Sequence, residues 1–138
     1  MACVSSFVYC DRLQQNNTPN GIQHQVIEPL QTLNLVSVPS NFSFSMLCVI
    51  SDFDTGKGHK LRIELVAPDD KSTVIVSTDV PIASDKRQKE FNGLQVAVEI
   101  RNFIFRLEGT YITKIFFDDV LIGEYKIPVI VGGHDAEC

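Results

Sequence analysis

Residues 109–131 read GTYITKIFFDDVLIGEYKIPVIV, which is the pattern of a β-hairpin. Two apolar runs rich in β-branched residues, 112–117 and 120–131, flank the dipeptide Asp118-Asp119. Aspartate is frequent in turns because its side chain bonds nearby backbone groups and because it tolerates left-handed dihedral angles. The segment therefore predicts two antiparallel strands joined by a short turn.

The length of this turn has two interpretations. In a two-residue turn Phe117 pairs with Val120. Ile115 then pairs with Ile122, and both faces of the hairpin become apolar. A three-residue turn separates the faces better, but it requires the β-branched Val120 to adopt a positive φ, which is costly. We expect the two-residue turn on these backbone grounds.

The middle and later parts of the chain show the same alternation of apolar and polar residues between turn signals, and helical periodicity is almost absent. Residues 41–50 carry five apolar side chains on one face. Residues 61–66 and 73–77 predict a hairpin around a proline-containing turn. From residue 94 the apolar positions alternate until Asn102, where the phase inverts, so we expect a β-bulge there.

The remaining segments are less regular. Residues 4–13 predict a strand, and the amide-rich residues 14–21 predict a surface turn. Residues 23–38 hold one predicted strand, around 25–30, followed by an irregular return. The stretch 78–93 contains a proline and a charged run, and we expect it to be a long crossing loop.

Together these patterns predict an all-β protein, a single antiparallel β-sandwich of seven to eight strands that is immunoglobulin-like in general architecture. A chain of 138 residues, 44% hydrophobic and 21% charged, suits one globular domain with its own core. We expect the sandwich to span residues 1–131. Residues 132–138 are expected to form a mobile tail.

Charge and cysteine spacing argue against several classes of protein. The formal net charge of −5 disfavours a protein that binds nucleic acid through general electrostatics. No apolar run approaches the roughly 18 residues of a membrane-spanning helix, so we expect no membrane contact. The four cysteines lack the paired CxxC spacing of zinc sites, and the first ten residues lack the basic region of a secretory signal. We therefore expect a reduced, cytoplasmic protein.

Four short motifs at strand ends and turns are spread over most of the chain. They are Asp11-Arg12 after the first predicted strand, Pro39 before an alternating strand, Ala67-Pro68-Asp69-Asp70-Lys71 in the middle hairpin, and Gly109-Thr110-Tyr111 before the last hairpin. In this order they resemble a family of small, uncharacterised bacterial proteins of unknown function. The resemblance implies a β-sandwich and supplies no catalytic residues. The chain departs from the family's pattern at Asp70 and Asp119, where turn glycines are usual and aspartate is tolerated.

The acidic loop at residues 52–56 is the best candidate for a metal site. Asp52 and Asp54 stand two apart before a glycine, a spacing that suits a hard cation such as Ca²⁺. An EF-hand loop would continue to a glutamate at its twelfth position, where Ile63 stands. A calcium site would therefore need further turn aspartates at the same end of the sandwich: Asp69, Asp70, Asp118 or Asp119. The alternative is that all of these are solvated turn residues, and we expect no cofactor.

Two features are candidates for contact with another protein. Under either turn length, an outward face of the last hairpin keeps apolar side chains among Ile112, Phe116 and Ile122, and exposed apolar surface often marks an interaction site. Self-association is the function that this face favours. A second contact, for an acidic partner, is offered by the cations of the predicted crossing loop: Lys86, Arg87 and Lys89. The alternative for this charged run is a solvated loop.

The favoured function is a non-enzymatic module for protein–protein interaction or assembly in the bacterial cytoplasm, which binds a protein partner or a second copy of the chain. The first alternative is a β-sandwich that binds a ligand or Ca²⁺ through its loops. The second is an enzyme whose site is assembled from residues distant in sequence. No GxSxG element occurs, and Cys10 and Cys48 lie within predicted strands, where we expect them to be buried hydrophobes and not nucleophiles.

Overall fold

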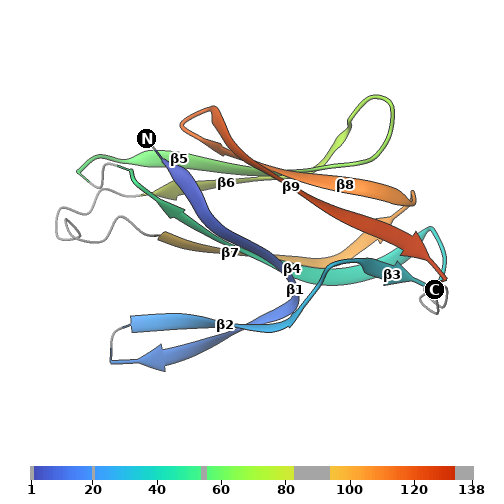
Figure 1. Ribbon diagram of the computed structural model, residues 1–138, viewed down its shortest axis with the longest axis horizontal. Coiled ribbons are helices and arrows are strands. Elements are labelled where there is room, and N and C mark those ends of the chain that lie inside the picture. Colours follow the sequence, from blue (N-terminus) through green and yellow to red (C-terminus); the bar gives the residue numbers. More distant parts are fainter. Residues whose placement is uncertain (1, 20, 54–55, 83–93, 133–138) are drawn as a thin grey trace.

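The computed structural model describes residues 2–19, 21–53, 56–82 and 94–132, and these residues form a sandwich of nine strands (Figure 1). The strands are β1 (Cys3–Thr18), β2 (Gly21–Pro29), β3 (Leu33–Leu35), β4 (Ser40–Ser51), β5 (His59–Val66), β6 (Val74–Ile82), β7 (Leu94–Phe105), β8 (Gly109–Phe117) and β9 (Val120–Val131). One sheet, here called sheet A, has the order β2-β1-β4-β7, and the other, sheet B, has the order β3-β9-β8-β5-β6. The predicted all-β sandwich is confirmed, although it has one strand more than the expected maximum.

The neighbouring strands of both sheets are antiparallel, except that β3 runs parallel to β9. None of the described residues belongs to a helix that is long and apolar enough to cross a membrane.

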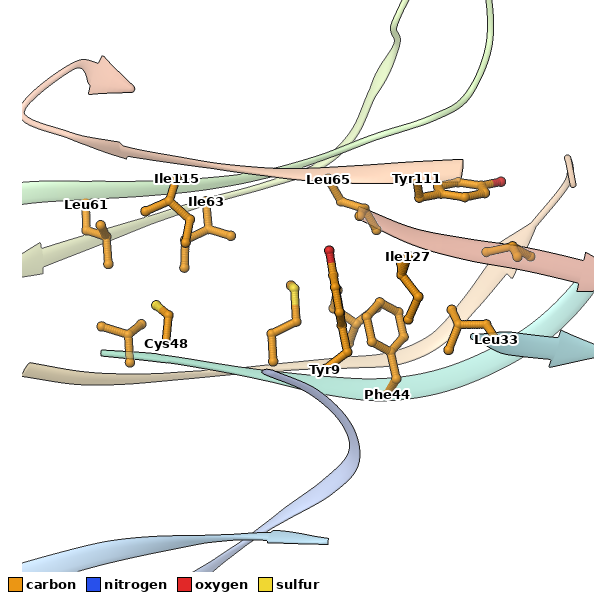
Figure 2. Packing of buried hydrophobic residues seen from close by; sticks show 14 of the residues in the cluster. Tyr9, Leu33, Phe44, Cys48, Leu61, Ile63, Leu65, Tyr111, Ile115 and Ile127 are labelled. Atoms are coloured by element: carbon orange, nitrogen blue, oxygen red, sulfur yellow. The ribbon is translucent and has the colours of Figure 1, made fainter. Parts of the chain in front are cut away.

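The core lies between the two sheets, whose inward side chains meet in one apolar layer (Figure 2). Phe44 and Ile50 of β4 are almost completely buried, and Leu61 of β5 lies on the opposing sheet. From Met46 to Ile50 in β4 and from Leu61 to Leu65 in β5, every second residue is buried, because successive side chains of a strand point to opposite faces. The alternation predicted for residues 41–50 and 61–66 is confirmed.

The last hairpin has the two-residue turn that the backbone argument favoured. Phe117 pairs with Val120 across it. Asp118 and Asp119 have φ angles of 49° and 67°, the left-handed values that a two-residue turn with the right-handed twist of a hairpin requires. The Asp118 N–H also donates to the Lys60 carbonyl on β5 (2.8 Å), so the turn is tied to the neighbouring strand.

One pairing expected beyond this turn is wrong. Ile115 does not pair with Ile122, because the register between β8 and β9 shifts by one residue at that position. Without this β-bulge, Tyr111 would stand opposite Lys126. With it, Tyr111 pairs with Ile127, and both side chains are buried. The bulge thus separates the apolar face of the hairpin from its polar face. A three-residue turn would have produced the same separation.

The β-bulge expected near Asn102 is confirmed. The ladder between β4 and β7 shifts register between Phe42 and Phe44, and Asn102 has a φ of 54°. The Asn102 N–H donates to the Ser43 hydroxyl (2.8 Å), which satisfies a backbone donor at the irregular point of the ladder. Beyond the bulge, Phe105 is buried, so the apolar face of β7 returns to the core.

The N-terminal strands differ most from expectation. Residues 14–18 continue β1 and do not form a turn, and Thr18 pairs with Gly21 at the tip of a β1–β2 hairpin. β1 pairs with β4 only as far as Cys10, and from there it pairs with β2 alone. Most described side chains of this hairpin are exposed. Because both of its faces are open to solvent, polar residues occur along the strands themselves, and a run of them does not indicate a turn. Figure 1 shows the hairpin extending away from the rest of the sandwich.

Two expected segments fall largely outside the described residues. The crossing loop was expected to begin at residue 78, but β6 continues to Ile82, and residues 83–93 are not among those described. Of the expected tail, only Gly132 is described, and its N–H donates to the Leu35 carbonyl (2.8 Å). The boundary between the domain and the tail stays a prediction.

A buried hydrogen bond links the two sheets. The Tyr9 hydroxyl on β1 donates to the Tyr125 carbonyl (2.9 Å) and shares a second hydrogen bond with the Thr113 hydroxyl (2.8 Å), both on sheet B. Figure 2 shows the Tyr9 ring reaching across the core toward that sheet. Burial raises the pKa of Tyr9 to about 12, because the protein interior disfavours the phenolate. Tyr9 is therefore a neutral, hydrogen-bonded part of the core.

Candidate functional site

A groove of about 570 Å³ opens between β6 and β7, which are the edge strands of sheet B and sheet A. It lies where the β5–β6 turn, the bulged end of β7 and the connection from β7 to β8 come together. Its apolar lining consists of Ala67, Ile75, Phe103, Ile104, Leu107 and Tyr111. This volume is in the range of ligand-binding pockets, and the lining mixes apolar side chains with a few polar ones, as such pockets do.

The turn between β5 and β6 forms one wall of the groove. Asp69 Oδ1 accepts the Thr73 N–H (2.9 Å), and Asp69 Oδ2 accepts the Thr73 hydroxyl (2.6 Å). These hydrogen bonds, led by the one from the Thr73 side chain, lower the pKa of Asp69. Ser72 has a φ of 50°, and its N–H donates to the Asp69 carbonyl (3.1 Å). The Asp69 carboxylate is therefore engaged within the turn.

The connection into β8 is held against that turn. The Tyr111 hydroxyl donates to the Leu107 carbonyl (2.8 Å), which fixes the three residues between β7 and β8. Gly109 has a φ of 139°, and a Cβ placed there would lie 2.8 Å from Pro68 Cγ. Only glycine permits both this backbone conformation and this approach. The contact brings the start of β8 next to the β5–β6 turn, and so it closes one end of the groove.

Apolar side chains are exposed at the mouth of the groove. Ile104 is 46% exposed and Leu107 is 44% exposed. Val74, which lies between two residues of the lining, is 45% exposed. Deeper in the groove, Tyr111 is buried, and its ring packs edge-on against Phe105 (5.2 Å between centroids). Exposed apolar surface that continues into a buried aromatic layer is typical of an interaction site.

The groove is lined by charged side chains of both signs, with both arginines on its β7 side. Arg101 NH2 lies 3.2 Å from Glu99 Oε2, and both side chains are largely exposed. Arg106 has no ion pair within the described part of the chain. Asp69, on the opposite wall, is negatively charged, and the hydrogen bonds from Thr73 stabilise that charge and lower its pKa. The groove therefore carries its cations on the β7 side and a carboxylate at the β5–β6 turn.

Of the two predicted metal residues, Asp52 and Asp54, only Asp52 is among the described residues. Asp52 has a φ of 63°, and its Oδ2 accepts from Cys3 Sγ (3.6 Å), while Asp54 lies outside the described residues. The turn aspartates are divided between the two ends of β5, with Asp118 and Asp119 at its start and Asp69 and Asp70 beyond its end. Within the described residues, no three side chains of the ligand types His, Cys, Asp and Glu come together.

A second polar cluster lies at the start of β5. His59 Nδ1 is 2.6 Å from Asp118 Oδ2, and the Lys60 N–H donates to Asp118 Oδ1 (2.9 Å). The hydrogen bond with His59, and then the one from Lys60, lower the pKa of Asp118. The His59 ring packs against Phe53 and Phe117, with centroids 5.6 Å and 4.7 Å away. These contacts anchor the β8–β9 turn to β5, which is a structural role.

The structure does not bring the three apolar residues predicted for an interaction face onto one surface. Ile122 packs against the core, whereas Ile112 and Phe116 are half-buried on the outer face of sheet B. Arg62 lies over the Phe116 ring (4.5 Å from its centroid). Its guanidinium is also close to Glu64 (3.0 Å) and Asp119 (3.4 Å). This part of the face is therefore covered by a charged side chain.

The predicted basic contact falls outside the described residues, which do not include Lys86, Arg87 or Lys89. The groove itself was missed by reasoning from sequence, although two of its parts had been noticed. The turn Ala67-Pro68-Asp69-Asp70-Lys71 and the segment Gly109-Thr110-Tyr111 carried the family resemblance, and the structure places them in contact. The contact between these two segments forms one end of the groove. The alternation of residues within strands does not show that the two segments touch.

The fold is a two-sheet β-sandwich, and a groove lies between an edge strand of each sheet. Residues 5–130 match DUF6941, a family of unknown function, and the chain belongs to that family. The resemblance to an uncharacterised family is confirmed. No curated protein matches the chain closely enough to count as a relative.

Solved structures are similar to the chain at low sequence identity. The alkylpurine DNA glycosylase AlkC of Pseudomonas fluorescens, bound to DNA with an abasic site analogue, matches with a TM-score of 0.50 and 6% identity, over 94% of this chain and 30% of that one. An immunoglobulin-like protein of Pseudomonas aeruginosa matches with a TM-score of 0.47 and 12% identity, over 94% and 97%. A β-glucosidase of Listeria innocua gives 0.46 and 11%, over 90% and 16%. This chain thus spans less than a third of the glycosylase chain, and the likeness to that protein concerns the fold alone.

Proposed function

We propose that this chain is a non-enzymatic protein–protein interaction module, and that its groove between β6 and β7 binds an extended, apolar and acidic segment of a partner protein. The observation that carries the proposal is the groove itself, in which exposed Ile104 and Leu107 lie beside Arg106. Arg106 has no ion pair within the described residues.

The position of the groove favours an extended occupant. β6 and β7 end their sheets, so each has one backbone edge that no other described strand pairs with. An extended peptide binds such an edge through main-chain hydrogen bonds, while side-chain pockets supply the specificity. Ile75 and Ile104, one from each edge strand, line the groove and offer apolar contacts on both sides.

The two arginines on the β7 side of the groove favour an occupant with an acidic residue on that side. Arg106 and Arg101 lie on the β7 side of the groove, and Glu99, the ion-pair partner of Arg101, is itself largely exposed. An arginine can bind a carboxylate through two parallel hydrogen bonds, and such charge-assisted bonds are among the strong ones. A glutamate or aspartate beside an apolar residue would therefore fit both features of the groove.

The titratable groups of the groove suit binding better than catalysis. Burial raises the pKa of Tyr111, and the hydrogen bonds from Thr73 lower the pKa of Asp69. Both shifts are away from neutrality, whereas a general acid or base works best with a pKa near the working pH. Among the described residues, the lining contains no histidine or cysteine.

A display selection tests this proposal directly. A library of random linear peptides is panned against the whole protein, and we expect enrichment of short sequences in which Asp or Glu adjoins a large apolar residue. Binding of a selected synthetic peptide should weaken at least about tenfold in Arg106→Glu and in Ile104→Asp, because each removes one of the two recognition features.

The matched controls reverse one cation and replace one isoleucine on β9. Lys126→Glu and Ile130→Asp alter exposed side chains away from the groove. They should bind the peptide as the wild type does, and thermal melts should show that all four variants are folded. If no peptide is enriched, or if the groove variants bind as tightly as the controls, the proposal is wrong.

A further inference from the structure

We propose that the segment bound in the groove carries a basic residue as well as an acidic one, and that Asp69 binds the basic residue while Arg106 binds the acidic one. The proposal rests on the proposed function of the groove and adds a second determinant of its specificity. Arg106 directly follows β7, and Asp69 lies in the turn between β5 and β6. The occupant would therefore be held by one ion pair on each wall.

The first argument is that these two opposite charges line one groove without pairing. Arg101, the other arginine of the lining, lies 3.2 Å from Glu99. Arg106 and Asp69 form no ion pair with each other or with any other described side chain. Charges in contact largely neutralise each other, whereas separated charges each keep their attraction for a charge on an occupant. The groove therefore presents one unpaired charge of each sign.

The second argument is that the Asp69 carboxylate is charged and held in place. Thr73 donates to Asp69 Oδ1 through its N–H (2.9 Å) and to Oδ2 through its hydroxyl (2.6 Å). A carboxylate accepts about four hydrogen bonds, so these two leave acceptor capacity for a further donor. They also fix the side chain before anything binds, and binding to an ordered group costs less conformational entropy. Asp69 is thus prepared to accept from a lysine or an arginine.

The third argument concerns the segments that this pair of charges excludes. A purely acidic segment would bring a carboxylate toward Asp69, and a purely basic one would bring a cation toward Arg106. Like charges that meet at an interface are unfavourable, so both kinds of segment bind less well than one that carries both charges. A segment bound in the reverse direction meets the same repulsion. Asp69 and Arg106 together therefore select the composition of the segment and its direction.

Asp69→Asn tests the proposal, because it removes the charge while an amide group can still bond both the N–H and the hydroxyl of Thr73. The probe is a synthetic peptide from the display selection, whose enriched sequences should contain Lys or Arg together with the acidic and apolar residues. Its binding should weaken about two- to fivefold, the range of an exposed ion pair. The matched control is Asp70→Asn, an exposed neighbour in the same turn that does not line the groove, and it should bind as the wild type does.

A double-mutant cycle shows whether Asp69 and the basic residue of the peptide interact. Replacing that residue with glutamine should weaken binding to the wild type by the same factor, and should weaken binding to Asp69→Asn no further. Thermal melts confirm that both variants are folded.

The possible outcomes separate this proposal from the proposed function of the groove. Additive losses in the cycle, enriched peptides without a basic residue, or equal binding by Asp69→Asn and Asp70→Asn would each overturn it. If Arg106→Glu still weakens binding in these cases, the proposed function stands. A selection that enriches no peptide would overturn both.

Discussion

The hydroxyl of Tyr9 bridges the two sheets inside the core, and its removal measures the contribution of one buried polar group. In Tyr9→Phe, Thr113 and the Tyr125 carbonyl lose their shared partner. We expect the free energy of unfolding to fall by about 1–2 kcal/mol, since an unsatisfied buried group costs this much. Urea denaturation with an unchanged m-value checks it. Equal stability of the variant would show that the bond contributes nothing.

The raised pKa of Tyr9 also predicts how stability changes at alkaline pH. The folded protein holds the Tyr9 proton more tightly than the unfolded chain, whose tyrosines titrate near pH 10, so the resulting stability is fully present below that pH. It is lost as the pH rises from about 10 to about 12. Thermal melts across this window should fall more steeply for the wild type than for Tyr9→Phe. Parallel curves would contradict the assignment.

The described cysteines should differ in reactivity. Cys3 is exposed, whereas Cys10 and Cys48 are buried, and burial raises the pKa of Cys48 to about 12. Since only the thiolate reacts, alkylation of the native protein at pH 8 should modify Cys3 and spare the two buried thiols. Mass spectrometry of the peptides checks this. Rapid labelling of Cys48 without unfolding would place it outside the core.

Among the elements, the β8–β9 turn is the one whose backbone can be improved. Asp119 has a φ of 67°, which glycine adopts at less cost. We expect Asp119→Gly to raise the free energy of unfolding by roughly 0.5–1 kcal/mol. Asp118→Ala should lower it by about 1 kcal/mol, because His59 and the Lys60 N–H lose their acceptor. Chemical denaturation compares both with the wild type, and a destabilised Asp119→Gly would argue against the two-residue turn.

At this scale, sequence reasoning succeeded where one face of a strand is buried. The alternation in β4 and β5 and the bulge at Asn102 follow from the period of two, because a core penalises any slip. It failed in the β1–β2 hairpin, where little apolar surface is buried and the amide residues of 14–18 resembled a turn. Sequence reasoning also missed the bulge at Ile122. A bulge and a longer turn both shift the register by one residue, so they place the same side chains on each face of the hairpin.

For the whole molecule, the sandwich could be predicted from the sequence and the groove could not. The groove depends on the contact of Gly109 with Pro68 and on the approach of two edge strands, β6 and β7. Neither leaves a periodic signal. The predicted apolar face failed for a related reason, because a bulge turned Ile122 toward the core and Arg62 came to lie over Phe116.

The most direct test of the central claim is a backbone amide NMR titration of the protein with a peptide from the display selection. We expect saturable shifts that cluster around the groove, at Ile75, Asn102, Ile104 and Leu107, and that disappear in Arg106→Glu. Shifts that cluster on the β1–β2 hairpin or on the outer face of sheet B, or a titration without saturable shifts, would contradict it.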